Sequence, residues 1–148
     1  MWHDIGTEDE RRLGPIFKQI NIRCMKAFNK KMEKHNLTFP QSEILLFLGC
    51  MDGQPVSQRQ IEMHLHLKNP TVTGLLKRLE EKNYVSRTIN PKDKRSHMVV
   101  LTKESQELLS VMRQEGEEMD QKLIEGLSEK EIEQLFCYLN VILNNIPK

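Results

Sequence analysis

The chain has 148 residues, of which 38% are hydrophobic and 29% are charged, a balance that fits one folded domain and excludes a disordered chain. Its net charge of +1 is unevenly distributed: residues 55–103 hold 10 Lys and Arg against 4 Asp and Glu (+6), whereas residues 104–148 hold 4 against 10 (−6). The basic middle segment favours a polyanionic partner, with a solvated charged face as the alternative.

Three features bear on where the protein acts. No stretch approaches the roughly 18 apolar residues of a membrane-spanning helix, so no membrane partner is expected. The N-terminal stretch MWHDIGTEDERRLG has no apolar segment, which argues against a signal peptide. Cys24, Cys50 and Cys137 are odd in number and widely spaced, so they predict no disulfide framework and fit a reducing cytoplasm.

The first two predicted elements are helices. Apolar residues at helical spacing predict an amphipathic helix over residues of about 11–35. Thr38 and Gln41 have the pattern of a capping box, and Pro40 stands where the first helical turn accepts it. The apolar run 44–48 continues this second helix, and residues 49–53 are expected to end it.

The next two predicted helices form a pair. Ser57 and Gln60 have a second capping-box pattern, which opens a short helix. Asn69 is expected to cap the following helix, and Asn83 to end it, because Asn tolerates a left-handed backbone. Two short helices with a tight connection, the second polar and cationic on its outer face, indicate a helix-turn-helix. The predicted buried stripe of the second helix is Val72, Leu75, Leu76 and Leu79.

A β-hairpin is predicted directly after these helices. The alternating residues 85–89 and the apolar run 98–101 flank an Asn-Pro turn. Such a hairpin is the wing of a winged helix, and its tip holds a cationic cluster around one acid. Because Arg enters narrow minor grooves, we expect Arg95 to probe the groove and Asp93 to hold its guanidinium by hydrogen bonds. A solvated loop tip is the alternative.

Two further helices complete the chain. Thr102 is expected to cap a long helix that extends to Leu127 and could bend at Gly116, and Ser128 with Glu131 opens the last helix. Both ends of the chain carry broad apolar stripes that a protein of this length has few elements to cover. Burial against a second copy is the simplest solution, so we predict a homodimer.

The order of these elements resembles the MarR family of transcriptional regulators, over residues of about 10–146. The segments that carry the resemblance are PVSQRQI, NPTVTGLLKRLEEKNYVSR and NPKDKRSHMVVLT. It implies a mainly α fold with a small β wing, in which a single MarR-type domain spans residues 1–148. Within it, a winged helix-turn-helix lobe covers about 38–102, and helices at about 11–35 and 103–147 intertwine with those of a second copy.

The resemblance also implies a function, that of a ligand-responsive repressor that binds a pseudo-palindromic operator in double-stranded DNA. It places the second helix of the helix-turn-helix in the major groove, where Thr, Lys and Arg contact base edges or phosphates. The start of the preceding helix offers backbone N–H groups to a phosphate. The predicted DNA-binding residues are Ser57, Gln58, Arg59, Asn69, Thr71, Thr73, Lys77, Arg78, Arg87, Lys92, Asp93, Lys94 and Arg95.

The alternatives to this function are catalysis, metal sensing, thiol sensing and a protein-only adaptor with a winged-helix fold, which the basic middle segment disfavours. The cysteines lie on or beside apolar stripes of separate predicted helices, where buried, inert Cys is common, so no enzyme and no cofactor are expected. His64 and His66 are alternate residues that face different sides of a helix, which argues against a metal site. A cation at Lys26, close to Cys24, keeps a redox-sensing role for this thiol as an alternative.

A small effector is a further implication of the resemblance. Many relatives bind small aromatic or phenolic anions in a cleft between the dimerisation helices and the DNA-binding lobe. Such a ligand releases DNA only if it binds the DNA-free conformation more tightly. Ordinary core and surface positions are the alternative for the candidate lining residues, which are Phe17, Ile20, Phe47 and Met51, with Arg23 or Lys18 for a carboxylate.

Overall fold

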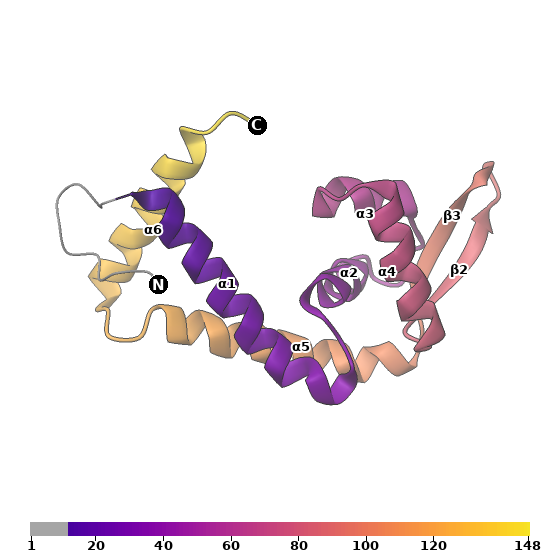
Figure 1. The fold of residues 1–148 in the computed structure, drawn as a ribbon, viewed down its shortest axis with the longest axis horizontal. Helices are drawn as coiled ribbons and strands as arrows, with labels where there is room; N and C mark the ends of the chain where they lie inside the picture. Colours follow the sequence, from indigo (N-terminus) through magenta and orange to yellow (C-terminus); the bar gives the residue numbers. More distant parts are fainter. Residues whose placement is uncertain (1–11) are drawn as a thin grey trace. The chain divides into compact units, whose positions relative to one another are not determined.

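The computed structural model describes residues 12–148 and is mainly helical, with one small antiparallel sheet (Figure 1). This confirms the predicted fold class. The chain divides into two compact units, one that extends to Glu115 and one from Gly116 to Lys148. The predictions about a signal peptide and about residue 11 fall outside the described residues.

The first unit begins with two helices whose ends were predicted well. Helix α1 spans Leu13–Met32 and continues as the short 3₁₀ helix η2, Glu33–His35. Helix α2 spans Phe39–Gly49, and Thr38 and Gln41 form the expected capping box. The first four N–H groups of a helix have no partner within it, and a capping box supplies acceptors for two N–H groups at the helix start.

The helix-turn-helix consists of α3, Gln58–Leu65, and α4, Asn69–Glu81. The predicted capping box of Ser57 and Gln60 is present at the start of α3. His66 ends α3 in the left-handed region with φ of 53°, which turns the chain within three residues. The prediction that Asn69 caps α4 is wrong, because Lys68 is the N-cap and Asn69 is already helical.

Asn83 ends α4 as predicted, in the left-handed conformation with φ of 61°. The N–H of Tyr84 donates to the carbonyl of Leu79, and the N–H of Asn83 to that of Glu80, both at 2.9 Å. This pair of bonds is a Schellman motif, which supplies donors to carbonyls that the helix end leaves free. The motif turns the chain directly into the wing.

The wing lies in a three-stranded sheet of order β1-β3-β2, made of β1, Val56–Ser57, β2, Val85–Asn90, and β3, Asp93–Leu101. In its register Val85 lies opposite Leu101 and Asn90 opposite Asp93, with an irregularity between Ile89 and Asn90. The strands therefore extend further than the predicted residues 85–89 and 98–101, because the polar residues 93–97 still pair with β2. Strand β1 was not predicted, since two residues carry no detectable alternation.

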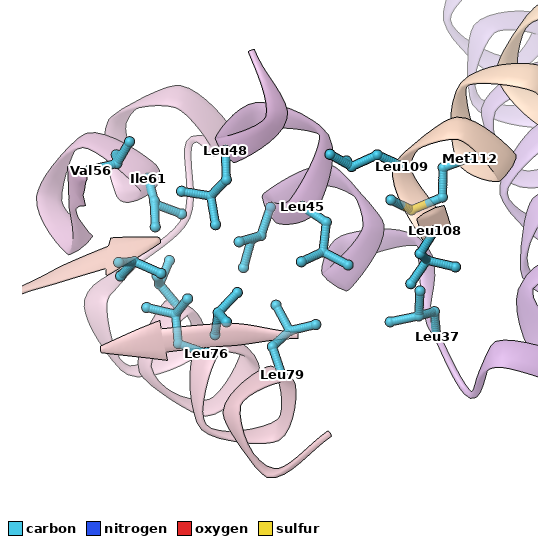
Figure 2. Packing of buried hydrophobic residues seen from close by; sticks show 14 of the residues in the cluster. Leu37, Leu45, Leu48, Val56, Ile61, Leu76, Leu79, Leu108, Leu109 and Met112 are labelled. Carbon is cyan, nitrogen blue, oxygen red and sulfur yellow. The ribbon is translucent and has the colours of Figure 1, made fainter. Parts of the chain in front are cut away.

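The core of the first unit lies where α2, α3, α4, the base of the sheet and the start of α5 meet (Figure 2). Ile44, Leu45 and Leu76 are fully buried there. Burial of a Leu side chain contributes about 1.5–3 kcal/mol. Val72 and Leu79 are buried as predicted, and Leu75 is half-buried at the edge of the same core.

The last two helices are α5, Glu104–Leu123, and α6, Glu129–Asn144. The Thr102 hydroxyl, predicted to cap α5, donates instead to the carbonyl of Asn83 at 2.6 Å and ties the end of the wing to the end of α4. Helix α5 ends before Leu127, because residues 124–128 turn through Gly126 with φ of 87°. The capping box that starts α6 at Ser128 is present as predicted.

Helix α6 buries none of its residues, although it is apolar along one side. Phe136 is 57% exposed and Leu143 is 68% exposed. Over residues 12–148, no helix combines the length and the apolar character needed to span a membrane.

Candidate nucleic-acid interface

Helix α4 separates its residues cleanly between a buried side and an exposed side. Val72, Leu76 and Leu79 point into the core, whereas Thr71, Thr73, Lys77 and Arg78 are exposed, as is Asn69 at the helix start. Asn69, Thr73 and Lys77 follow one another at intervals of four residues and so form one row along the helix. The predicted DNA-reading residues of α4 therefore share an open surface.

A chain of hydrogen bonds links the exposed sides of α3 and α4. Gln58 Nε2 donates to Thr73 Oγ1 at 2.8 Å and to Glu62 Oε1 at 3.3 Å. Asn69 Nδ2 donates to the same Glu62 oxygen at 2.7 Å, and Thr73 Oγ1 donates to Asn69 Oδ1 at 3.5 Å. Three predicted DNA-binding residues thus meet in one network, whose fourth member, Glu62, was not predicted.

The start of α3 places the other predicted contacts of this helix. Ser57 Oγ accepts the N–H of Gln60 at 3.2 Å, so its hydroxyl holds the helix start. Ser57 is half-buried, whereas Arg59 is exposed at the first turn. Cations and N–H groups at this end suit a phosphate.

The tip of the wing is braced by its own polar side chains. Asn90 Oδ1 accepts the N–H of Lys92 at 3.0 Å, and Asn90 Nδ2 donates to Ser96 Oγ at 3.1 Å. Lys92, Lys94 and Arg95 are exposed around this frame. The wing therefore presents three cations on a backbone whose conformation is fixed locally.

Two wing residues have partners that the sequence did not predict. Asp93 Oδ1 accepts the backbone N–H of Arg95 at 3.0 Å, so it fixes the backbone at Arg95 rather than holding the guanidinium. Arg87, predicted as a phosphate contact, donates through Nε and Nη2 to Glu80 Oε2 at 2.9 and 2.6 Å. Arg87 therefore joins the wing to α4, and a phosphate would have to compete with Glu80 for it.

The thiols are arranged differently from the prediction. Cys50 and Cys137 are exposed and Cys24 is half-buried, so the expectation of three buried thiols is wrong. Cys50 follows the last turn of α2, and Cys137 lies on the helix that buries nothing. His64 stacks on Phe47 with ring centroids 4.0 Å apart. Within residues 12–148, no cluster of three or more His, Cys, Asp or Glu has the arrangement of a metal site.

A cavity of about 400 Å³ opens between the end of α2, the end of β3 and the start of α5. Its lining includes Asp52, Gln106, Ser110 and Arg113, together with apolar Leu109. A Cβ at Gly49 would come within 2.9 Å of a Leu109 methyl, so glycine allows α2 and α5 to approach. None of the predicted effector-lining residues lines this cavity.

Comparison with known proteins matches this arrangement of helix-turn-helix and wing. The family model described as MarR family matches residues 37–97. An uncharacterised HTH-type transcriptional regulator of Bacillus subtilis, YwoH, is 36% identical over 94 residues, which span 62% of this chain and 66% of that protein. The chain belongs to the MarR family. It is a DNA-binding transcriptional regulator and not an enzyme.

Solved structures of family members on DNA are similar to this regulator over nearly its whole length. A Staphylococcus aureus MepR–DNA complex is 27% identical, with a TM-score of 0.83, over 92% of this chain and 98% of that one. A mutant of Escherichia coli MarR complexed with operator DNA is 25% identical, with a TM-score of 0.77, over 88% and 93%.

Proposed function

We propose that this regulator is a ligand-responsive repressor that binds a pseudo-palindromic operator as a homodimer. The observation that carries the proposal is the pairing of an exposed polar row on α4 with a braced cationic wing in the same unit. A helix of this kind fits a major groove, and an Arg on an adjacent hairpin fits the neighbouring minor groove.

The proposed DNA-binding residues form two groups: readers, which contact base edges, and anchors, which bind phosphates. Asn69, Thr71 and Thr73 meet base edges, where amides and hydroxyls hydrogen-bond and the Thr methyl packs on thymine. Arg95 enters the minor groove, positioned through the Asp93 bond to its backbone. The remaining cations and the start of α3 bind phosphates, which fix register without reading sequence. These anchors are Ser57, Arg59, Lys77, Arg78, Arg87, Lys92 and Lys94, together with the backbone N–H of Gln58 at the start of α3, whose side-chain amide is left for a base.

The homodimer is supported by apolar surface at both ends of the chain. Leu13 and Phe17 on α1 are 55% and 40% exposed, and the apolar side of α6 is exposed as well. Exposed apolar side chains in such number are typical of an interface. On this proposal, residues 1–148 form one MarR-type domain that a second copy completes, with a two-fold axis that matches two operator half-sites.

An effector completes the proposal. The cavity beside α2 and α5 contains Arg113, which suits the carboxylate of a small aromatic or phenolic acid, and Leu109, which suits its ring. Such a ligand would act by binding the DNA-free conformation more tightly. On this proposal the regulator acts in the cytoplasm.

The test of the proposal is a binding titration on a library of duplexes at several salt concentrations. We expect a pair of half-sites about 34–36 Å apart and a log–log salt slope of about −0.9 per phosphate neutralised. Arg95→Ala should weaken binding most where A·T-rich flanks narrow the minor groove, whereas Lys34→Ala, at an exposed cation outside the lobe, is the matched control. Flat salt dependence on every duplex would refute the proposal.

A further inference from the structure

We infer that Glu62 determines which base pairs the helix-turn-helix prefers, by fixing how Gln58 and Asn69 present their amide groups. The inference rests on the proposed DNA-binding function and concerns a residue that the sequence did not single out. Glu62 lies on α3, where it is half-buried, four residues after Gln58 and seven before Asn69. It is a positioning residue, because its effect on DNA passes through its neighbours.

The direction of each hydrogen bond follows from the chemistry of the groups. A carboxylate can only accept, so both amides must turn their NH₂ groups toward Glu62. Glu62 Oε1 receives Gln58 Nε2 at 3.3 Å and Asn69 Nδ2 at 2.7 Å. Two nitrogen atoms from different helices converge on one oxygen, and that oxygen sets the orientation of both amides.

Thr73 is oriented through the same network. Gln58 Nε2 has two N–H groups, and the second one reaches Thr73 Oγ1 at 2.8 Å. The Thr73 hydroxyl therefore accepts from Gln58 and directs its proton toward Asn69 Oδ1 at 3.5 Å. An Asn or Gln amide that reverses would place an oxygen against the carboxylate, which like partial charges disfavour.

The amide groups of Gln58 and Asn69 that this network does not use are the ones that a base pair can contact. Both N–H groups of Gln58 are used, so its free group is the carbonyl oxygen, which accepts. Acceptors favour the N4 amino group of cytosine or the N6 amino group of adenine in the major groove. Asn69 retains one N–H, which suits N7 or O6 of guanine, N7 of adenine or O4 of thymine. Glu62 thereby gives the two amides opposite preferences.

Glu62 also carries a charge close to the DNA phosphates, and this second effect must be separated from the first. A negative charge weakens binding to every duplex, irrespective of sequence. Loss of charge and loss of orientation both follow from Glu62→Gln, which keeps the size of the side chain. Only the loss of orientation changes the ranking of base pairs, because a Gln at this position accepts through oxygen or donates through nitrogen and lets the neighbouring amides reverse.

The experiment compares Glu62→Gln with Glu81→Gln, which removes an exposed charge from the same lobe, on a duplex library randomised beneath α4. We expect Glu81→Gln to raise affinity on all duplexes with an unchanged ranking. Glu62→Gln should raise affinity on weak duplexes while lowering discrimination by about tenfold at the base pairs that Gln58 and Asn69 meet. A combined Glu62→Gln and Asn69→Ala variant should lose little more discrimination than Asn69→Ala alone at the Asn69 base pair.

Each outcome bears on one claim. An unchanged ranking for Glu62→Gln, with a melting temperature equal to that of the parent, overturns the role of Glu62 but leaves DNA binding intact. Independent, additive losses in the combined variant would also overturn it. A parent protein that binds no duplex, or binds all equally, would instead refute the proposed function. The melting temperature of each variant identifies any that fail to fold.

Discussion

The lobe of the first unit and helix α6 of the second use similar apolar residues with opposite results. Leu45 and Leu76 in the lobe are completely buried, whereas Phe136 and Leu143 on α6 are 57% and 68% exposed. The lobe closes its own core because α2, α3 and α4 cross around the base of a sheet. Helix α6 has a stripe of the same kind and no residue that is buried.

This difference indicates what each part needs in order to bury its apolar side chains. The lobe needs only its own chain to remove apolar surface from water, at about 25 cal/mol for each Å². The stripe on α6 gains that free energy only when another surface covers it. The stability of the second unit should therefore depend on protomer concentration, and that of the lobe's internal packing should not.

The largest expected effect comes from breaking the α6 stripe. Leu143→Glu places a charge where the proposed dimer would bury an apolar side chain, twice per dimer. At about 1.5–3 kcal/mol for each lost side chain, the dimer dissociation constant should rise by at least about 100-fold. Sedimentation or light scattering against concentration measures this.

Gln134→Glu is the matched control for this change, because it adds the same charge on the polar side of α6. We expect it to leave the mass at twice 17.4 kDa. A Leu143→Glu protein that remains dimeric at nanomolar concentration would show that another surface forms the interface.

The next effect lies in the lobe. Leu76→Ala leaves a cavity among fully buried neighbours and should lower the free energy of unfolding by about 2–5 kcal/mol. Lys77→Ala, one residue further along and exposed, should change it by less than about 0.5 kcal/mol. Denaturant titrations at fixed protomer concentration measure both. A larger loss for Lys77→Ala than for Leu76→Ala would contradict the assignment of the two sides of α4.

The sequence predicted the elements whose signal is local. The capping boxes at Thr38, Ser57 and Ser128 were all placed correctly, because each needs only two residues three positions apart. The left-handed Asn83 was also predicted from its residue type alone. Patterns of this kind are complete within one turn of chain. The caps predicted from a single residue, at Asn69 and Thr102, failed, because Lys68 is the N-cap of α4 and the Thr102 hydroxyl donates to the distant carbonyl of Asn83.

The contacts that the sequence did not predict concern side chains with a choice of partners. Asp93 had two groups of Arg95 within reach and took the backbone N–H. Arg87 found Glu80 on another element, and Asn69 found Glu62 across the turn of the helix-turn-helix. Such choices depend on which elements meet in space, and spacing along the chain carries no information about them.

A smaller effect tests the turn between α4 and the wing. Asn83→Ala forces a Cβ-bearing residue without a local hydrogen-bonding side chain into the left-handed region and should cost about 1 kcal/mol. Asn83→Gly should cost less or stabilise, because glycine adopts this backbone freely. The carbonyl that accepts from Thr102 is retained in both variants. If thermal melting shows the Asn83→Ala protein to be at least as stable as the Asn83→Gly protein, residue 83 does not adopt the left-handed conformation.

The smallest effect is a contrast of pH dependence between the two parts. Burial raises the pKa of Glu43 in α2, with a partial offset from nearby His64, whereas the bonds from Ser128 lower the pKa of Glu131 at the start of α6. The raised pKa means that Glu43 destabilises the fold once it is charged, above its folded pKa. The lowered pKa means that Glu131 stabilises the fold above about pH 4.5, and that this contribution disappears as the pH falls through its folded pKa.

The two isosteric substitutions should therefore have opposite signs at neutral pH. Glu43→Gln should raise the melting temperature slightly. The gain in the free energy of unfolding should be well under about 1 kcal/mol, because Glu43 is only half-buried. Glu131→Gln should lower it, although Gln still completes a capping box, since only the charge is lost. Both differences should shrink as the pH is lowered toward 4.5 and below, where the parent carboxylates also become neutral. Melting curves of the two variants from pH 4 to 8 measure both effects. A shift in the same direction for both variants would show that burial of Glu43 in the lobe is not what sets its pKa.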